Sequence, residues 1–281
     1  MGTSSVATAS VPLILIFFVP HVHAQNASSS FHPFGLNVSA STTQLWIEVT
    51  SGYGHEIREE ADLESLDMVG FSDVGWDGIP FISLSSKGRS EDYLVHELMH
   101  LKLRLEGYPH QIRWTSNCLT DGPLEMWLSR NLKDSIEHWI FYPRVLAMGL
   151  IPDAELAKDM RRAIQMNSPE DDTLSVDQLA FEYFRALILP NQTDLGDEFR
   201  AWYRKRGWAQ ALKIADRMFG ILTSLRPNTP RAEITVFVDC ANVLLSERRH
   251  VEETGWSVLR IGDLQLQGVD IAMTSLVPCA P

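Results

Sequence analysis

The amino-acid sequence predicts an α+β fold, with a small sheet near the N-terminus, a helical majority and a β-rich C-terminal tail. Segments with strand patterns come first, before the earliest well-capped helix. Five segments with helical periodicity follow, separated by Pro or Gly: 124–142, 153–166, 175–189, 195–206 and 208–221. Alternating apolar residues return between 257 and 273, which predicts strands near the C-terminus.

The first 24 residues resemble a secretory signal peptide. They hold no charged side chain, and an apolar run from Val11 to Val19 precedes small residues at Val22 and Ala24, where a signal peptidase reads. The run is too short to span a membrane. We therefore expect a secreted or periplasmic protein, cleaved near Ala24, with a flexible mature N-terminus over residues 25–40. The alternative is a buried N-terminal strand or short helix.

Two short segments are candidates for the N-terminal sheet. Residues 43–50 alternate in polarity and predict a strand, and residues 79–84 predict another. Pro80 places the second strand at a sheet edge, because proline cannot donate to the hydrogen-bond ladder. Between them, residues 57–68 predict a short helix or an irregular acidic stretch.

The composition bears on nucleic-acid binding and on the number of disulfides. The formal charge is −12 with an ordinary 45% of apolar residues, and no dense block of Lys and Arg indicates nucleic-acid binding. Three cysteines exclude a disulfide-dense scaffold and allow one intramolecular bridge. We expect that bridge between Cys240 and Cys279, since both lie in the C-terminal segment.

The most informative stretch is the expected helix that follows Ser90. Ser90 is a good N-cap, and Gly107 ends the run. Within it, His96 and His100 lie four residues apart, so one helix face can direct two imidazoles at one ion. Glu97 lies beside them, where a carboxylate can take a proton from a metal-bound water.

The run His96-Glu97-Leu98-Met99-His100 resembles the active-site helix of the zincin metallopeptidases. The resemblance implies zinc as the cofactor, a peptide or protein as the substrate, two histidine ligands and Glu97 as the catalytic glutamate. The chain departs from the metzincin branch, which carries Gly and His at the positions of Leu103 and Glu106. It also lacks the later Asn-Glu pair of thermolysin-like enzymes, so the resemblance names no branch.

The same resemblance bears on domain organisation. It implies a zincin-like metal-binding domain over residues 41–230, in which an edge strand holds an extended substrate. Residues 79–84 are the candidate for that strand, and an ordinary edge strand is the alternative. Residues 231–281 are expected to be a β-rich segment of the same domain, although 231–245 fits either a strand or a helix.

A third protein ligand is required, because a catalytic zinc site holds three and keeps one position for water. The expected helix 124–142 is the obvious source. A helical wheel places His138 and Asn131 at the edge of its apolar face, with Asp134 one turn before His138. His138 is then the predicted ligand, with Asp134 and Asn131 as supporting polar partners and Asp134 fixing the tautomer of His138.

Two glutamates remain as alternatives to His138. Glu137 has the right chemistry, but the wheel places it among Arg130 and Lys133 on a solvated face. Glu125 lies in the first helical turn, where the helix dipole favours an acid. All three candidates stay open at the level of sequence.

Together these features predict an exported zinc-dependent peptidase in which Glu97 is the general base. The alternative is a zincin-like binding or structural module that is stabilised by metal and has no catalytic turnover. Glu97 favours catalysis, because a purely structural site would be closed by a fourth protein ligand instead. A coincidental motif in a secreted α+β domain is the remaining possibility.

Overall fold

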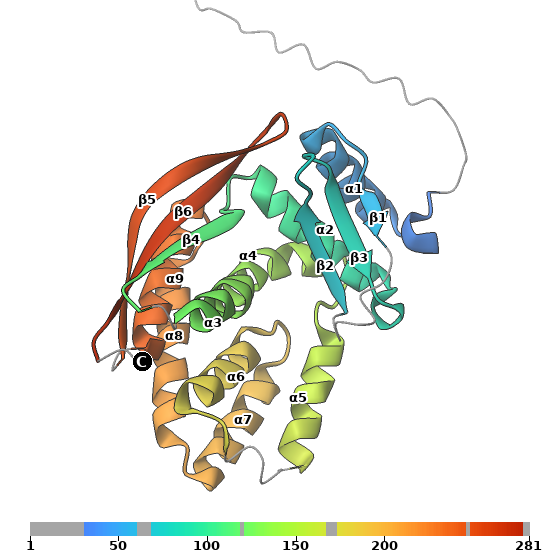
Figure 1. The fold of residues 1–281 in the computed structure, drawn as a ribbon. Coiled ribbons are helices and arrows are strands. Elements are labelled where there is room, and N and C mark those ends of the chain that lie inside the picture. Colours follow the sequence, from blue (N-terminus) through green and yellow to red (C-terminus); the bar gives the residue numbers. More distant parts are fainter. Residues whose placement is uncertain (1–30, 61–68, 119–120, 167–172, 246–247, 278–281) are drawn as a thin grey trace, which may run out of the picture. The chain divides into compact units, whose positions relative to one another are not determined.

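Helices make up most of the described chain, and two small mixed sheets accompany them (Figure 1). The computed structural model describes residues 31–60, 69–118, 121–166, 173–245 and 248–277. The α+β class with a helical majority is therefore confirmed. The expected signal peptide lies outside the described residues.

Helix α1 (Ala40–Tyr53) occupies the segment 43–50 that was expected to be a strand. The strand prediction is wrong because the side chains are buried with helical spacing: Leu45, Val49 and Tyr53 are in the core, whereas Ile47 is half exposed. Ser39 caps the helix, its Oγ accepting a hydrogen bond from Thr42 N at 3.2 Å. Residues 33–35 before it form a 3-10 turn.

The first sheet contains β1 (Arg58–Glu60), β2 (Gly70–Val74) and β3 (Pro80–Leu84) in the order β1-β3-β2. A strand at 79–84 is confirmed, but its placement at the sheet edge is wrong. Pro80 is tolerated in the central strand because it is the first residue of β3, opposite Val74 at the end of the ladder. The antiparallel edge strand is β2 instead.

Helix α2 (Glu91–Leu105) confirms the predicted helix of the His-Glu-x-x-His motif. Ser90 caps it as expected, accepting from Tyr93 N at 3.4 Å. One face packs on α1, where the buried Tyr53 hydroxyl donates to Leu101 O at 3.0 Å. Strand β2 also packs against α2.

The predicted helix 124–142 is divided by a turn of π-helix. Helix α3 (Gly122–Trp127) leads into the π-helical turn Leu128–Leu132, and α4 (Lys133–Ala147) continues from it. A π turn inserts an extra residue, which changes the direction of every later side chain relative to a uniform helical wheel. A uniform helical wheel over 124–142 therefore does not apply to residues after the π turn.

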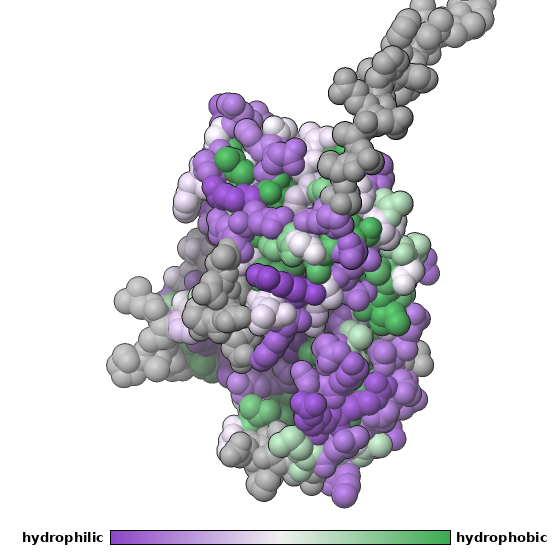
Figure 2. All heavy atoms as spheres, turned by 90° about the vertical axis from the view of Figure 1, so that its right-hand side faces the viewer, coloured by the Kyte–Doolittle hydropathy of each residue, from purple (hydrophilic) through white to green (hydrophobic). Residues whose placement is uncertain are grey.

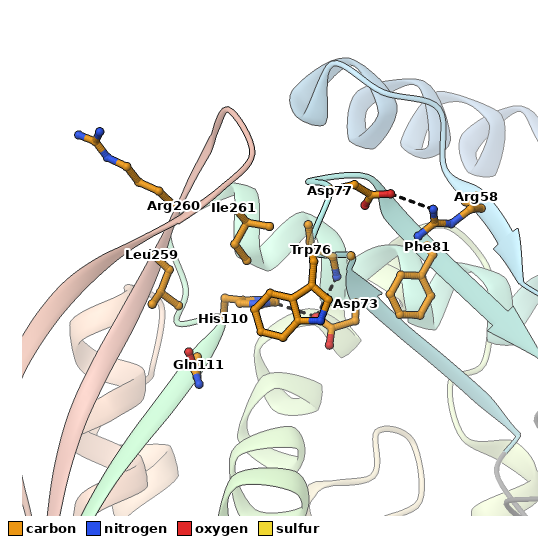
Figure 3. A pocket seen from close by; sticks show the side chains of 12 residues that line it. Arg58, Asp73, Trp76, Asp77, Phe81, His110, Gln111, Leu259, Arg260 and Ile261 are labelled. Carbon is orange, nitrogen blue, oxygen red and sulfur yellow. Dashed lines mark hydrogen bonds and ion pairs between the residues drawn. The ribbon is translucent and has the colours of Figure 1, made fainter.

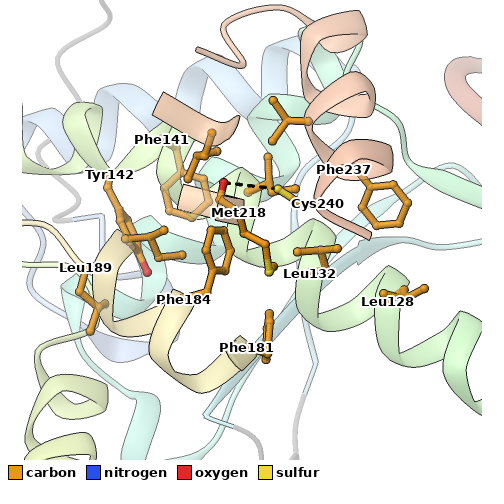
Figure 4. Packing of buried hydrophobic residues seen from close by; sticks show 14 of the residues in the cluster. Leu128, Leu132, Phe141, Tyr142, Phe181, Phe184, Leu189, Met218, Phe237 and Cys240 are labelled. Carbon is orange, nitrogen blue, oxygen red and sulfur yellow. Dashed lines mark hydrogen bonds between the residues drawn. The ribbon is translucent and has the colours of Figure 1, made fainter. Parts of the chain in front are cut away.

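The second half of the described chain supplies five helices, of which the first four match predicted helical segments and the last lies where the sequence fitted either a strand or a helix. They are α5 (Ala154–Met166), α6 (Val176–Ile188), α7 (Thr193–Arg206), α8 (Ala209–Leu225) and α9 (Pro230–Leu245). Segment 231–245 is thus helical. Aromatic and aliphatic side chains of α4, α6, α8 and α9 meet in one hydrophobic core, which includes Phe141, Phe184 and Phe237 (Figure 4).

The second sheet joins the C-terminal tail to the middle of the chain. Strands β5 (Arg249–Ile261) and β6 (Leu264–Ser275) form a long hairpin, which confirms the β-rich tail. Strand β4 (Gln111–Ser116) pairs in parallel with β6 and has no counterpart in the sequence prediction. Residues 31–281 form one compact unit.

Two further expectations concern cysteine pairing and membrane association. Cys240 is a buried free thiol, so the expected Cys240–Cys279 bridge is wrong, and Cys118 is the disulfide-bonded cysteine. Cys240 lies on α9 inside the core, with its Sγ 3.6 Å from Met218 O (Figure 4). Within the described residues, no helix is long and apolar enough to cross a bilayer. Polar side chains surround small apolar patches on the face in Figure 2.

Candidate metal centre

Helix α2 brings His96 and His100 together as their spacing predicts. Their Nε2 atoms lie 3.3 Å apart, and the ring centroids are 5.0 Å apart. His100 is buried and His96 is partly buried. The i,i+4 arrangement on one helix face is sufficient to explain this approach.

His138 completes a group of three imidazoles from the facing helix α4. Its ring centroid is 4.5 Å from that of His96 and 5.3 Å from that of His100. One ligand atom from each of the three residues lies within 4.8 Å of the others. Phe141, one helical turn away, packs edge-on against all three rings and covers the group with an apolar surface.

The other ring nitrogen, Nδ1, of each histidine faces an acidic or phenolic oxygen. His100 Nδ1 is 2.8 Å from Glu137 Oε2, and His138 Nδ1 is 3.0 Å from the Tyr142 hydroxyl. His96 Nδ1 is 3.6 Å from Asp153 Oδ1. For His100 and His138 these Nδ1 contacts favour the tautomer in which Nε2 carries a lone pair, which is the form that binds metal, whereas His96 Nδ1 has no hydrogen-bond partner.

The convergence of Nε2 atoms fits a metal ion. For bonds of about 2.0–2.1 Å, two nitrogen ligands of a tetrahedral zinc lie about 3.3–3.4 Å apart, and the His96–His100 separation of Nε2 atoms is 3.3 Å. His138 Nε2 is buried with no hydrogen-bond partner. Burial, reinforced by His96, holds the pKa of His138 well below its usual value, so the ring is neutral and free to coordinate.

Asp134 lies on the coordinating side of the histidines. Its two carboxylate oxygens are 3.4 Å from His100 Nε2 and 3.2 Å from His138 Nε2. Asp134 therefore lies beside His138 as expected, but it faces Nε2 and not Nδ1. With 43% of its side chain exposed, Asp134 is a potential fourth ligand that can also turn toward solvent.

Glu137 is buried, which overturns its expected place on a solvated face. Only 1% of its side chain is exposed, and it accepts hydrogen bonds from Arg104 and Lys133 besides its contact with His100. The two cations hold the pKa of Glu137 well below its usual value against the opposing effect of burial. Glu137 contacts His100 and binds two buried cations, and with His100 and Asp134 it forms a second group of side chains that could hold a metal ion.

A uniform wheel over residues 124–142 does not hold past the π turn, because an inserted residue shifts the angle of every later side chain. In the structure both residues reach the cluster: Glu137 contacts His100, and the His138 ring packs against His96 and His100. Asn131 lies inside the turn, and its side-chain amide donates to Trp127 O at 3.0 Å. Asn131 therefore supports the local backbone and is not brought to the histidines.

Asp153 is the functional residue that sequence reasoning missed. It reaches both His96 and His138, with Oδ1 3.6 Å from one Nδ1 and Oδ2 3.7 Å from the other, and it accepts a hydrogen bond from Tyr142. Its backbone is left-handed at φ 54°, a conformation that costs free energy and recurs at functional sites. The sequence signal, an Asp after Pro152, read only as a helix cap.

Glu97 is buried on the side of α2 that faces β2. A Cβ atom at Gly70 would lie 2.6 Å from Glu97 Oε1, so glycine at this position lets the carboxylate lie against the strand. Ser72 Oγ donates to the Glu97 carbonyl at 3.1 Å. Burial raises the pKa of the Glu97 carboxyl to about 7. The structure thus places this carboxylate between the motif helix and the edge strand.

The remaining candidate is Glu125, and it lies apart from the histidines. It occupies the first turn of α3, and the metal-binding groups of the described residues do not include it. A cavity of about 290 Å³ reaches one histidine of the cluster, His96, and is also lined by Asp153 and Tyr93.

Comparison of the chain with protein-family models, with curated proteins and with solved structures gave no match. The site is therefore interpreted from its own geometry.

Proposed function

We propose that the protein is an exported zinc-dependent peptidase of the zincin type. The observation that carries this proposal is the cluster of three imidazoles, in which one ring nitrogen of each residue lies within 4.8 Å of the others. His96 Nε2 lies 3.3 Å from His100 Nε2, and His138 Nε2 is buried without a hydrogen-bond partner. Three imidazoles form a ligand set that zinc accepts readily.

The roles of the residues follow from their positions. His96, His100 and His138 would hold the zinc, while Glu137, Tyr142 and Asp153 orient their rings. Bound zinc supplies Lewis-acid polarisation of the scissile carbonyl and lowers the pKa of a coordinated water. Glu97 would take the proton of the attacking water and transfer it to the leaving amine.

The edge strand supports a peptide as the substrate. Strand β2 pairs with β3 alone among the described strands, so its other edge offers backbone groups to an extended chain. Glu97 lies against Gly70 at the start of this strand. In this role β2 replaces segment 79–84, because β3 is enclosed between two strands.

Metal content and one conservative substitution test the proposal. Purified protein should contain one zinc per chain, and His96→Ala should lose it. Glu97→Gln should retain zinc and the fold, yet lose about two to four orders of magnitude in chelator-sensitive hydrolysis of an unfolded protein substrate. A wild-type protein that holds no zinc, or whose cleavage survives Glu97→Gln, would refute the proposed chemistry.

A second candidate function is a metal-stabilised binding or structural module. Asp134 favours it, because a carboxylate 3.2–3.4 Å from two ligand nitrogens is placed to close the coordination sphere. For such a module, Asp134→Asn would weaken zinc binding, chelation would lower the melting temperature, and no peptide would be cleaved. Hydrolysis that depends on Glu97 separates the two candidates.

A further inference from the structure

A pocket of about 790 Å³ lies outside the histidine cluster, between the two sheets (Figure 3). Its lining comes from the β2–β3 turn, the start of β4 and the end of β5. Its volume is within the range of sites that enclose a drug-sized ligand, which corresponds to a short stretch of peptide.

Two glycine turns close one side of this pocket. A Cβ atom at Gly78, in the β2–β3 turn, would lie 3.0 Å from Ile261 O, and one at Gly262 would lie 3.0 Å from Asp77 O. Both glycines have positive φ, at 81° and 58°. The tips of the two hairpins thus touch backbone to backbone, and glycine at both positions permits the contact.

The walls of the pocket are aromatic and aliphatic. Trp76 is 96% exposed, an unusual state for the largest apolar side chain. Phe81 lies beside it, and Leu259 and Ile261 of β5 stand opposite (Figure 3). An indole face presented this way suits an alkyl chain or a cation.

The charges around the pocket leave one carboxylate available. Arg58 and Asp77 neutralise each other through a hydrogen bond of 3.0 Å. Arg260 is directed away from the other lining side chains in Figure 3. Asp73 has its side chain 42% exposed and one ionic contact, His110 Nδ1 at 3.5 Å. Asp73 lies next to Trp76 and places a negative charge in the pocket, in a chain whose net charge is −12.

The edge strand connects this pocket to Glu97. Gly70 touches the Glu97 carboxylate, and Asp73 lies three residues further along the same strand. At about 3.3 Å per residue, the distance is roughly 10 Å. Because successive side chains of an extended chain point to opposite faces, a peptide along β2 would bring the side chain three residues from the position at Glu97 to the pocket.

We propose that this pocket binds a lysine or arginine side chain of a peptide lying along β2, with the alkyl part against Trp76 and the cationic group at Asp73. The proposal rests on the proposed function for the position of the peptide. The preference for a cationic side chain is argued from the pocket alone, which combines the Asp73 carboxylate, the exposed Trp76 indole and an aliphatic lining.

Binding to a non-hydrolysing protein tests the pocket. The probes are fluorescein-labelled decapeptides of Gly, Ala and Ser with one Lys, moved through successive positions, and a matched set with Glu in its place. Fluorescence anisotropy with zinc-loaded Glu97→Gln protein should show a preference for Lys over Glu of about tenfold or more at one position. Trp76→Ala should weaken the binding of the Lys peptides.

Charge substitution provides the decisive comparison. Asp73→Asn keeps the oxygen that accepts from Val74 N and should abolish the Lys preference, whereas Asp73→Lys should reverse it toward Glu. Glu252→Gln, an equal loss of charge at an exposed position of β5, should leave the preference unchanged. Circular dichroism of each variant verifies folding.

The outcomes separate the two proposals. Equal binding of Lys and Glu peptides, no binding at all, or a preference that survives Asp73→Lys overturns the pocket proposal, even when the wild type cleaves peptides. A Lys preference that depends on Asp73 supports the pocket, even when the wild-type protein holds no zinc and cleaves nothing. That second result would overturn only the proposed peptidase.

Discussion

Glu137→Ala tests the buried ion network behind the histidine cluster. A uniform helical wheel predicts an exposed Glu137, whose removal changes the free energy of unfolding by no more than about 0.5 kcal/mol. In the structure Glu137 is 1% exposed and holds the Arg104 and Lys133 cations, which are 15% and 6% exposed. Removing one partner of a buried ion pair costs about 3–5 kcal/mol.

Two features determine where the loss in the free energy of unfolding should fall between about 3 and 5 kcal/mol. The loss of Glu137 leaves two cations uncompensated, which favours the upper part of the range. Glu233 lies 4.0 Å from Lys133 Nζ and offers partial compensation, which favours the lower part. For a domain of this size, a loss of 3–5 kcal/mol lowers the melting temperature by roughly 6–20 °C.

Chemical and thermal denaturation in the presence of a chelator measure this effect. The chelator matters because Glu137 also contacts His100, and bound metal would add its own contribution to stability. Glu137→Gln, which keeps the size and removes the charge, should show most of the loss. Glu155→Ala removes a glutamate from an exposed i,i+3 pair with Lys158 and should stay within about 0.5 kcal/mol. A similarly small effect of Glu137→Ala would refute the buried network.

Three other substitutions or measurements address the remaining features. His138→Ala should weaken zinc binding more than the 10–100-fold typical of losing a supporting partner, while Glu125→Ala should leave it unchanged; competition with a zinc indicator measures both. Asp153→Asn should lower zinc affinity by about 10–100-fold, because one carboxylate faces two histidines; an unchanged affinity would contradict that role. Burial raises the pKa of the Cys240 thiol, so a thiol reagent should label it only after denaturation, as mass spectrometry can show.

Glu137 and Asp153 are two carboxylates that lie beside the histidines. Each supports the cluster from a different direction: Glu137 from within α4, and Asp153 from the loop before α5. Glu137 is fixed by buried cations, whereas Asp153 is held by the Tyr142 hydroxyl and a left-handed backbone. The histidines are therefore flanked by two carboxylates that are restrained in different ways.

Sequence alone was enough for the features that depend on neighbouring residues. The cap at Ser90 and the i,i+4 pair of His96 and His100 follow from the geometry of one helix. The later helices were also recognisable, because their apolar periodicity is long and is interrupted by Pro or Gly. Short segments were less reliable: 43–50 alternates over a few residues, yet buries a helical face.

Tertiary structure decided everything that depends on distant partners. The buried position of Glu137 depends on its distant partner Arg104, and no local pattern predicted either that pairing or the π turn before α4. Strand β2 became the edge, and β4 joined the C-terminal hairpin, through pairings between segments far apart in the chain. Asp153 reaches the histidines only because the start of α5 folds back onto them. Helix geometry is local and periodic, so sequence reveals it, whereas strand neighbours and buried charge partners are fixed only when the whole chain packs.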